Sequence, residues 1–441
     1  MFQTLCALPG GRVRGELRVP GDKSISHRAI MLGSIAEGQT RVSGFLEGAD
    51  ALATMNVFRA MGVAIEGPQG GEVTVQGVGL HGLKAPAGPL ECGNSGTSMR
   101  LLSGLLAGQR FESRLVGDAS LSRRPMRRVV EPLAAMGARI DTVEGHPPLL
   151  VHPVGGLQAA DIRMNVASAQ VKSALILAGL YAVGTTRITE PAPTRDHTER
   201  MLAAFGVTTG RDGPLVSIAG GQPLAGCRID VPADISSAAF FLVAASISPG
   251  AELNLRHVGM NATRTGVLQI LRAMGADIVE TNPRVIGGEP VADLRVRGAH
   301  LRGIEIPPEL VPLAIDEFPV LFIAAACAEG TTLLRGAEEL RVKESDRIAV
   351  MAEGLQAIGM AVQPTPDGMR IEGRGGESAP FTGGTVGSHG DHRIAMAFAV
   401  AALRSRSPIT ILDTENVNTS FPGFAQMAAS VGMPVQAAVG G

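Results

Sequence analysis

The segment SALILAGLYAVGTTRIT, residues 173–189, consists of an apolar run of helical length, a turn that contains glycine and a strand-like stretch. Because the helix is apolar nearly all round, we expect it to be buried, with a sheet outside it. The same order of elements recurs in five other segments: residues 29–45, 100–117, 238–256, 320–336 and 394–412. A buried helix followed by a strand is therefore the recurring element of this chain.

A second, amphipathic helix follows each of these segments and ends at a glycine, as in ILRAMGADI at residues 270–278. The glycine follows the last periodic residue, which predicts a left-handed helix ending and then a short strand. The glycines recur about 70 to 85 residues apart, a spacing too long for a solenoid repeat: Gly62, Gly137, Gly206, Gly275, Gly359 and Gly432. Chance periodicity is the alternative, but both helices recur in the same order.

These patterns predict an α/β fold, an inside-out barrel of six βαβαββ-like repeats with buried helices and outer sheets, three repeats in each of two similar domains. We expect residues 22–232 to form one domain. Residues 1–21 and 233–441 are expected to form the other, so that the N-terminal strand belongs with the C-terminal half. Because clefts between domains favour ligand binding, we expect the active site in that cleft.

The composition argues against several classes of protein. A net charge of −2, no tryptophan and one tyrosine do not favour a nucleic-acid-binding surface. The longest apolar run, residues 318–327, is about half of a membrane span, and the first residues do not resemble a signal peptide. The widely spaced cysteines predict reduced thiols in a cytoplasmic protein, with no metal site; a catalytic thiol is the alternative: Cys6, Cys92, Cys227 and Cys327.

Lysine is rare, because nearly all of the positive charge is arginine. The four lysines are Lys23, Lys84, Lys172 and Lys343. A lysine kept in such a background indicates a specific need for an ammonium group. Two of them, Lys23 and Lys343, lie in polar motifs.

The polar motif VPGDKSISHRA, residues 19–29, stands where the first buried helix begins. Ser24 or Ser26 can cap that helix, and Lys23 and Arg28 project near its start. A helix N-terminus with lysine, serine and arginine suits a phosphate or a carboxylate. An ordinary cap with solvated charges fits these residues equally well.

Two motifs in the same half have comparable positions. GNSGTSMR, residues 93–100, has two glycines that let backbone N–H groups approach an anion closely. It is neither a Walker loop nor a dinucleotide fingerprint. In SLSRRPMRR, residues 120–128, we expect a helix to start at Pro125, with Arg123 or Arg124 at its mouth as an anion ligand. Surface charge is the alternative for this arginine cluster.

Two further motifs continue the series. ASAQVKSA, residues 167–174, offers Ser168 and Gln170, which are uncharged hydrogen-bonding groups suited to hydroxyls. TRDHTER, residues 194–200, begins the following helix. We expect Arg195 to be exposed near the cap of that helix.

The C-terminal half has acids where its buried helices begin. LAIDEFP, residues 313–319, places Asp316 and Glu317 before a very apolar helix. A poorly solvated acid there can act as a base, and helix capping is the alternative. In GDHRIAMAF, His392 and Arg393 open the sixth buried helix. His392 is a candidate proton donor, and a structural histidine is equally compatible with the pattern.

RVKESDRI, residues 341–348, packs Lys343, Glu344 and Arg347 closely. We expect Lys343 and Arg347 on one helical face, a pattern that a salt-bridged surface helix also shows. Taken together, the polar motifs open the buried helices of successive repeats, so their N-termini can converge on one cleft. The chain is therefore predicted to be a two-domain enzyme that acts on small phosphorylated anions.

Seven motifs, in this order and spacing, closely resemble the EPSP synthase family: GDKSISHRA, GNSGTSMR, SRRPM, SAQVKSA, DEFP, RVKESDR and GDHRIAMA. The resemblance runs essentially from end to end and implies the inside-out α/β fold of two threefold domains. It also implies transfer of the enolpyruvyl group of phosphoenolpyruvate to the 5-hydroxyl of shikimate 3-phosphate. That reaction belongs to aromatic amino acid biosynthesis, is a glyphosate target and needs no metal or organic cofactor.

The resemblance implies three catalytic residues. Lys23 contacts both substrates, Asp316 takes the proton of the attacking hydroxyl, and Glu344 delivers a proton to the methylene carbon. The residues implied to bind shikimate 3-phosphate are Lys23, Ser24, Arg28, Ser168, Ala169, Gln170, Arg195, Asp316 and Lys343. Those implied to bind phosphoenolpyruvate are Lys23, Gly96, Arg124, Gln170, Arg347 and Arg393.

The sequence departs from many relatives at four positions. Thr419 stands where they have a lysine near the C-terminus, Ala169 replaces a serine, Arg195 a tyrosine and Glu339 an asparagine. These residues resemble a variant subgroup, some of whose members tolerate glyphosate. Gly96, where tolerant members carry alanine, points the other way, so sensitivity to this inhibitor stays open.

Three alternatives share this architecture or its binding residues. A UDP-N-acetylglucosamine enolpyruvyl transferase shares the fold, but its loop usually carries a reactive cysteine that residues 111–128 lack. A non-catalytic metabolite-binding homologue would bind the ligands without releasing phosphate, yet Lys23, Asp316 and Glu344 are intact. An RNA-end cyclase has related architecture, but this chain lacks a basic face. No repeat shows an additional apolar face that would need a partner subunit, so we expect a monomer.

Overall fold

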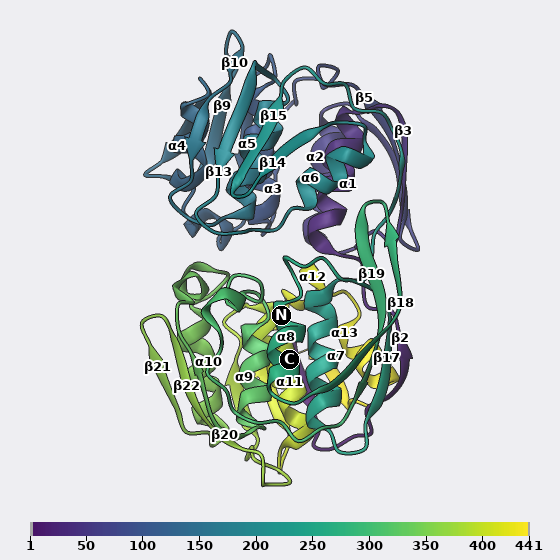
Figure 1. The fold of residues 1–441 in the computed structure, drawn as a ribbon, viewed down its shortest axis with the longest axis vertical. Helices are drawn as coiled ribbons and strands as arrows, with labels where there is room; N and C mark the ends of the chain where they lie inside the picture. The colour runs from purple at the N-terminus through teal and green to yellow at the C-terminus, as the bar shows by residue number, and fades with distance from the viewer. Residues whose placement is uncertain (1–2, 440–441) are drawn as a thin grey trace. The chain divides into compact units, whose positions relative to one another are not determined.

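The computed structural model describes residues 3–439, which divide into two compact units (Figure 1). The N-half unit contains Gly21–Val231 together with Val285–Glu289. The C-half unit contains Met1–Pro20, Pro232–Arg284 and Pro290–Gly441. Residues 1, 2, 440 and 441, which the predicted domains include, lie outside the described residues.

Three buried helices form the centre of the N-half unit: α1 (Lys23–Ile35), α3 (Gly96–Ala107) and α5 (Ala169–Gly179). Their apolar residues belong to one hydrophobic core, in which α3 packs against α5. The predicted burial of these helices is confirmed, because their side chains are apolar on nearly every side. The other helices are α2 (Ala49–Ala60), α4 (Arg127–Ala134), α6 (His197–Ala204) and the 3-10 helix η1 (Leu121–Arg123).

The strands of the N-half unit flank these helices. They are β3 (Glu37–Ser43), β4 (Ala64–Gln69), β5 (Glu72–Val78), β6 (Leu90–Glu91), β7 (Ser113–Val116), β8 (Arg139–Val143), β9 (His146–His152), β10 (Leu157–Gln158), β11 (Asp161–Arg163), β12 (Ala182–Val183), β13 (Thr185–Thr189), β14 (Thr209–Asp212), β15 (Leu215–Ala219) and β16 (Arg228–Asp230). The sheet orders are β16–β3–β5–β4, β6–β7–β9–β8, β11–β13–β15–β14 and β10–β12. Each four-stranded sheet has one parallel pair followed by two antiparallel pairs.

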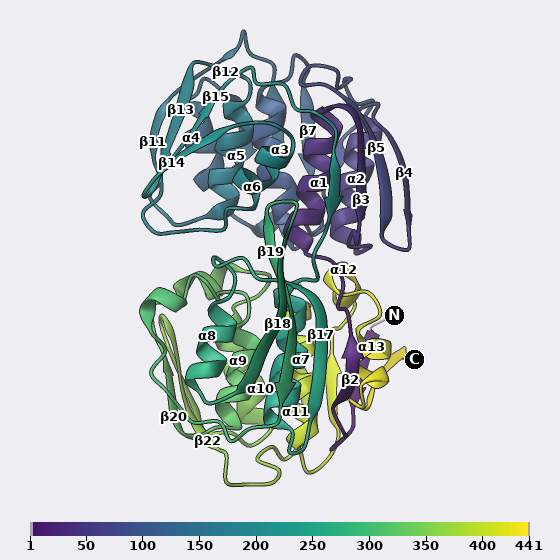
Figure 2. The same cartoon turned by 45° about the vertical axis from the view of Figure 1, so that its right-hand side comes forward.

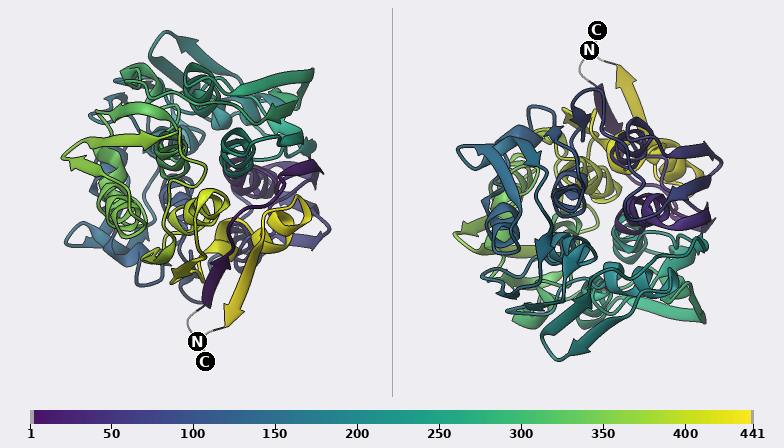
Figure 3. Two further views of the ribbon diagram at one scale, coloured as in Figure 1. Left: turned by 90° about the horizontal axis from the view of Figure 1, so that it is seen from below. Right: turned by 90° about the horizontal axis from the view of Figure 1, so that it is seen from above.

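The C-half unit has its own buried helices: α7 (Ile235–Ile247), α9 (Phe318–Ala326) and α11 (His392–Ala401). Every residue of α7 and α9 is buried, as their uninterrupted apolar sequences predict. In the end-on views these helices lie inside the strands of their unit (Figure 3). The remaining helices are α8 (Gly266–Ala273), α10 (Arg347–Ala357), α12 (Val417–Ser420), α13 (Phe424–Ser430), η2 (Pro308–Leu310), η3 (Glu338–Val342) and η4 (Ala402–Arg404).

The N-terminal strands lie in the sheets of the C-half unit (Figure 2). The strands of the C-half unit are β1 (Gln3–Ala7), β2 (Arg14–Leu17), β17 (Glu252–Gly259), β18 (Asp277–Ile286), β19 (Glu289–Arg297), β20 (Glu329–Leu334), β21 (Val362–Thr365), β22 (Gly368–Arg374), β23 (Gly384–Gly387), β24 (Ile409–Leu412) and β25 (Val435–Val439). Their orders are β23–β24–β1–β25, β18–β19–β17–β2 and β20–β22–β21. β1 pairs antiparallel with β24 and β25, and β2 runs parallel to β17.

The amphipathic helices end as the sequence predicts. The glycines after α2, α4, α6, α8, α10 and α13 have φ values between 84° and 96°, so their left-handed conformation is confirmed. Within residues 3–439, none of the helices combines the length and apolar character that crossing a membrane requires.

Two predicted helix starts are wrong. A helix was expected at Pro125, but α4 begins at Arg127. Arg124 is extended, which a helix start at Pro125 would allow, but Met126 occupies the N-cap position of α4 with φ −114° and ψ −8°. Lys343 and Arg347 were expected on one helical face, but η3 ends at Val342 and α10 begins only at Arg347.

Candidate active site

In the N-half unit, two nearby aspartates, Asp22 and Asp50, bind the first turn of α1. The predicted cap by Ser24 or Ser26 is wrong, because the Asp22 side chain accepts the N–H of Ile25 at 2.9 Å. An aspartate favours the positive end of a helix more strongly than a hydroxyl does. Lys23 forms an ion pair with Asp50, which is buried at the start of α2.

Arg28 is one turn further along α1, and only 4% of it is exposed. Its guanidinium donates to the Ser24 carbonyl at 2.9 Å, the Ser173 hydroxyl at 2.7 Å and the Thr198 hydroxyl at 2.7 Å. Burial lowers the pKa of Arg28 to about 10, so the group keeps its charge at neutral pH. The result is a fixed cation between α1, α5 and α6.

The starts of α3 and α5 are joined through Gln170. Its Oε1 accepts from Arg100 at 2.6 Å, and its Nε2 donates to the Thr97 hydroxyl at 2.9 Å. Ser168 caps α5 by accepting the Val171 N–H, and Ala169 is the first residue of that helix. These contacts fix the amide of Gln170 between two helix N-termini.

Arg124 lies against the loop that precedes α3. It donates to Asn94 Oδ1 at 2.8 Å and to the Ser120 hydroxyl at 3.4 Å. Asn94 in turn donates to Asp118 at 2.7 Å. A Cβ atom placed on Gly96 would lie 3.2 Å from an Arg124 terminal nitrogen, so the glycine keeps space beside this guanidinium.

Arg195 precedes α6 in the same unit. The prediction that it is exposed is wrong, because it is only partly exposed, and Asp196 occupies the N-cap position next to it. The first residues of α6 are buried, which draws the segment before the helix inward. Arg195 therefore lies near the helix N-terminus but not on a freely solvated surface.

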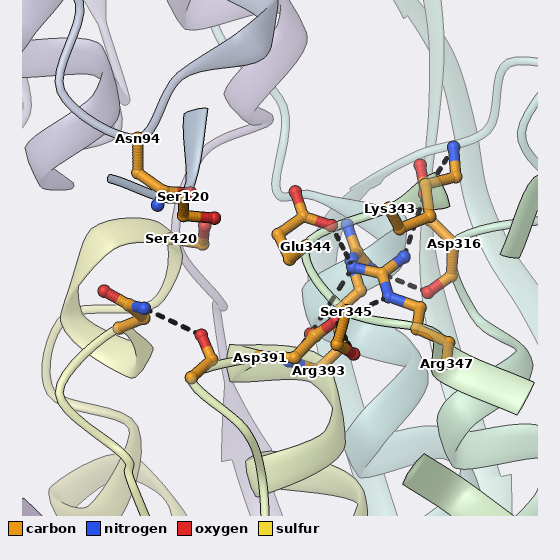
Figure 4. Close-up of polar contacts among 12 residues, drawn as sticks. Asn94, Ser120, Asp316, Lys343, Glu344, Ser345, Arg347, Asp391, Arg393 and Ser420 are labelled. Carbon is orange, nitrogen blue, oxygen red and sulfur yellow. Dashed lines mark hydrogen bonds and ion pairs between the residues drawn. The ribbon is translucent and has the colours of Figure 1, made fainter. Parts of the chain in front are cut away.

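In the C-half unit, three acids surround Arg347, of which 1% is exposed (Figure 4). Its guanidinium donates to Asp391 at 2.8 Å, to Glu344 at 2.6 Å and to Asp316 at 3.3 Å. Burial alone would lower the pKa of Arg347, but the negative charges of Asp391, Glu344 and Asp316 outweigh it and raise the pKa. Asp316 and Glu344 therefore lie on one permanently charged guanidinium.

Lys343 and Arg393 complete this group of charges. Lys343 Nζ lies 3.6 Å from Asp316 and 3.5 Å from Glu339. Lys343 and Arg347 therefore share Asp316 as a partner, although they do not lie on one helix. Arg393 donates to the Asp316 carbonyl at 3.0 Å and lies 3.8 Å from Glu317. Asp316 is thus contacted by three cations.

Two further positions that the sequence singles out, His392 and Thr419, are not among the hydrogen-bond partners of Arg347. His392 is buried at the first position of α11. Thr419 lies in the short helix α12 and donates its hydroxyl hydrogen to the Asn416 carbonyl at 2.6 Å. A hydroxyl engaged in its own helix cannot replace the long reach of a lysine.

His27 lies on α1 between Lys23 and Arg28 and is fully buried. Its Nδ1 lies 2.8 Å from the Thr54 hydroxyl, and its Nε2 lies 3.4 Å from the hydroxyl of Ser95, which caps α3. Burial lowers the pKa of His27 well below 6.5, and the charges of Lys23 and Arg28 lower it further. The imidazole is therefore neutral in the folded protein.

This neutral imidazole makes the stability of the protein sensitive to acid. Below pH 6.5, the ordinary histidine value, the unfolded chain binds a proton at His27 that the folded chain does not. The free energy of unfolding then falls by about 1.4 kcal/mol per pH unit, until the lowered folded-state pKa is reached. We expect His27→Asn to flatten this slope in urea unfolding measured from pH about 7 to about 5. Parallel slopes for the two proteins would contradict a buried neutral His27.

Both units combine cations with acids near the starts of their buried helices, and in the C-half unit the acids lie among Lys343, Arg347 and Arg393. The cations of the N-half group are Lys23, Arg28, Arg100, Arg124 and Arg195. The acids of the C-half group are Asp316, Glu344 and Asp391. Cations of this kind suit anionic ligands, and carboxylates can accept or donate protons.

Four residues of these groups were missed from the sequence. Asn94 and Arg100 lie inside the motif GNSGTSMR, for which the prediction rests on the two glycines alone. Asp391 directly precedes His392, and its position before a buried helix was a signal for a cap. Asp50, the partner of Lys23, had no such signal, because it lies on a separate helix.

The cysteine and metal predictions can be compared with the structure. All four cysteines are free, and burial raises the pKa of Cys327 to about 12 and that of Cys227 to about 11. Burial also raises the pKa of Cys92. Thiols of this kind do not form a thiolate at neutral pH. Among residues 3–439, no three histidines, cysteines or acids are grouped to hold a metal ion.

Comparison with known proteins gives one consistent family. A model described as EPSP synthase (3-phosphoshikimate 1-carboxyvinyltransferase) matches residues 8–427. The 3-phosphoshikimate 1-carboxyvinyltransferase of Alkalilimnicola ehrlichii is 68% identical over 426 residues, covering 96% of this chain and 95% of that protein. The enzyme of the same name from Methylococcus capsulatus is 66% identical and covers 97% of both chains.

A solved structure of EPSP synthase from Acinetobacter baumannii has a TM-score of 0.90 and 56% sequence identity, with 99% of this chain and all of that chain covered. The fold and these relatives define the class of protein: it is an α/β enzyme whose charged side chains gather near the starts of buried helices. Within that class, the chain belongs to the EPSP synthase family, the 3-phosphoshikimate 1-carboxyvinyltransferases. The resemblance read from the seven motifs is confirmed.

Proposed function

We propose that this protein transfers the enolpyruvyl group of phosphoenolpyruvate to the 5-hydroxyl of shikimate 3-phosphate, giving EPSP and inorganic phosphate in the shikimate pathway. The observation that carries the proposal is the pair of acids, Asp316 and Glu344, on the guanidinium of Arg347. Two such carboxylates can serve a reaction in which one proton is removed and another is delivered. Membership of the EPSP synthase family supports the same substrates.

The cations of the N-half group suit the two anionic substrates. In this proposal shikimate 3-phosphate binds Lys23, Ser24, Arg28, Ser168, Ala169, Gln170, Arg195, Asp316 and Lys343. Phosphoenolpyruvate binds Lys23, Gly96, Arg124, Gln170, Arg347 and Arg393. Arginine forks suit carboxylate and phosphate oxygens, and their fixed positions favour a transition state in which charge moves onto oxygen.

The proposed reaction is an addition followed by an elimination. Asp316 accepts the proton of the 5-hydroxyl while the hydroxyl oxygen attacks C2 of phosphoenolpyruvate. Glu344 gives a proton to C3, which becomes a methyl group in a tetrahedral phospho-intermediate. Loss of phosphate and of one methyl proton then restores the vinyl group. Lys23, held by Asp50, stabilises charge near the transferring oxygen.

Both groups of residues must act on the same pair of substrates, so we propose that residues 22–232 and residues 1–21 with 233–441 are two domains whose cleft holds the site. We also propose six related repeats in an inside-out barrel. The shared strand pattern of the N-half sheets and the glycine endings of the six amphipathic helices support this. A cytoplasmic monomer is the proposed form.

The direct test incubates the protein with shikimate 3-phosphate and phosphoenolpyruvate in the presence of EDTA and follows inorganic phosphate. We expect release that requires both substrates and that Lys23→Ala abolishes. Release only with UDP-N-acetylglucosamine would overturn the proposal in favour of the sister transferase. Binding of both substrates without phosphate release would support a metabolite-binding homologue instead.

Gly96 gives a prediction specific to phosphoenolpyruvate. A methyl group there would lie 2.9 Å from a terminal nitrogen of Arg100 and 3.2 Å from one of Arg124, so the guanidinium of Arg100 must shift and that of Arg124 must give way slightly. We expect Gly96→Ala to raise the KM for phosphoenolpyruvate about tenfold, the scale of one misplaced methyl group. The KM for shikimate 3-phosphate should rise less, and only through Gln170, which Arg100 holds. Gly88→Ala, whose new methyl meets no atom within 4 Å, is the control. Equal constants for the two variants would contradict this role.

A further inference from the structure

Lys172 is fully buried in the N-half unit, although its side chain carries a charge. It lies on α5, two residues after Gln170. Its ammonium is 3.1 Å from Glu190 and 2.8 Å from Glu199, and it donates to the Thr194 carbonyl at 3.5 Å. A buried charge of this kind persists only when it is paired and hydrogen-bonded.

The partners of Lys172 bracket the segment before α6. Glu190 stands at the beginning of this segment, Thr194 lies within it, and Glu199 follows in the first turn of α6. The Thr194 hydroxyl donates to Glu190, so the hydroxyl and the carbonyl of Thr194 are both engaged. Arg195 comes directly after this anchored residue.

A second cation balances the two acids. Arg211 on β14 lies 3.2 Å from Glu190 and 3.7 Å from Glu199, and 41% of its side chain is exposed. Two acids thus share two cations, one on the surface and one inside. Removing Lys172 would leave the inner side of both carboxylates uncompensated.

The same contact between α5 and α6 also holds Arg28. Ser173, the residue after Lys172, and Thr198, the residue before Glu199, both accept hydrogen bonds from Arg28. The Thr198 hydroxyl donates to that of Ser173 at 2.7 Å. Lys172 is therefore adjacent in sequence to Ser173, which binds Arg28, and it contacts Thr194, which precedes Arg195.

We propose that Lys172 is a positioning residue that fixes Arg195 and Arg28 for the phosphate of shikimate 3-phosphate. The inference rests on the proposed function, because the substrate comes from it. Lys172 acts through the segment Glu190–Asp196 and does not itself touch substrate. It sets the affinity for shikimate 3-phosphate and leaves the affinity for phosphoenolpyruvate and the chemical step unchanged.

The site requires an ammonium in particular. The three N–H groups of a lysine point in three directions and match three acceptors, two in the segment before α6 and one in α6. A guanidinium is planar and larger, so it cannot reach the same three acceptors from the same backbone position. This agrees with the retention of a lysine in a chain whose positive charge is otherwise almost all arginine.

The test measures steady-state constants for both substrates in Lys172→Met, Lys172→Arg and the charge-balanced double variant Lys172→Met/Glu190→Gln. We expect each to raise the KM for shikimate 3-phosphate about tenfold or more, the scale of one lost charged hydrogen bond. The KM for phosphoenolpyruvate and kcat should stay within about twofold of the unaltered protein. Lys84→Met, at an exposed lysine away from this cluster, is the control.

Three results would overturn the inference: an unchanged KM for shikimate 3-phosphate, equal changes in both KM values and kcat, or full rescue by Lys172→Arg. Failure of all three variants to fold would show a role in stability alone and would also overturn it. Failure of the proposed function appears separately, as no turnover by the unaltered protein. In that case, calorimetric binding of shikimate 3-phosphate to the same variants still decides the inference.

Discussion

Replacing Arg347 with methionine is expected to abolish turnover and to lower the free energy of unfolding by about 3 to 5 kcal/mol, the usual cost of removing one partner of a buried ion pair. The variant leaves Asp316, Glu344 and Asp391 close together around an apolar side chain. Their mutual repulsion raises the pKa values of the carboxyls. Urea unfolding at neutral pH measures the deficit.

The deficit should depend on pH in a defined direction. Carboxyls whose folded-state pKa is raised take up protons as the pH falls, which removes their repulsion in the folded variant. The difference in stability between the variant and the unaltered protein should therefore shrink towards acid pH. Arg341→Met is the control, because Arg341 is partly exposed and its ion pair with Asp346 should contribute about 1 kcal/mol or less. A constant deficit at every pH would contradict the electrostatic origin.

Replacing Asp316 with asparagine should lower kcat by a factor of about 10² to 10⁴, the usual contribution of a general base. The amide keeps the size of the side chain but cannot accept the proton of the attacking hydroxyl. The amide oxygen can still accept a hydrogen bond from Arg347, and Arg393 still donates to the backbone carbonyl of residue 316, so the side chain should keep its position.

Kinetics with both substrates and a thermal melt test this prediction together. The KM values should change much less than kcat, and the melting temperature should stay close to that of the unaltered protein. Glu353→Gln, an exposed acid on α10, is the control for removing a carboxylate from this unit. A fall in kcat of less than about tenfold would show that Asp316 is not the base.

The fold was largely predictable because its determining patterns are local. The apolar helices, the amphipathic helices and the glycine that ends each of them can be identified within about 20 residues of sequence. The exceptions are local as well. Pro125 is typical of a first helical position, yet α4 starts two residues later, after Met126. Lys343 was placed on a helix, although a 3-10 turn ends just before it.

The partners within the site were not predictable, because they join distant parts of the chain. Arg347 and Glu344 belong to one motif, but Asp391 and Asp316 come from two others. Periodicity contains no information about such pairs. Lys172 is an intermediate case: its rarity as a lysine was visible, but its three partners were not.

The most direct measurement of the mechanism is to run the reaction in D₂O and to examine the vinyl group of the product by NMR and mass spectrometry. The account predicts deuterium at the methylene carbon of EPSP, because the proton delivered through Glu344 creates a methyl group that later loses one of three hydrogens. Glu344→Gln should slow product formation and deuterium incorporation together. Product formed at the full rate without deuterium would contradict the addition and elimination, and with them the roles given to Asp316 and Glu344.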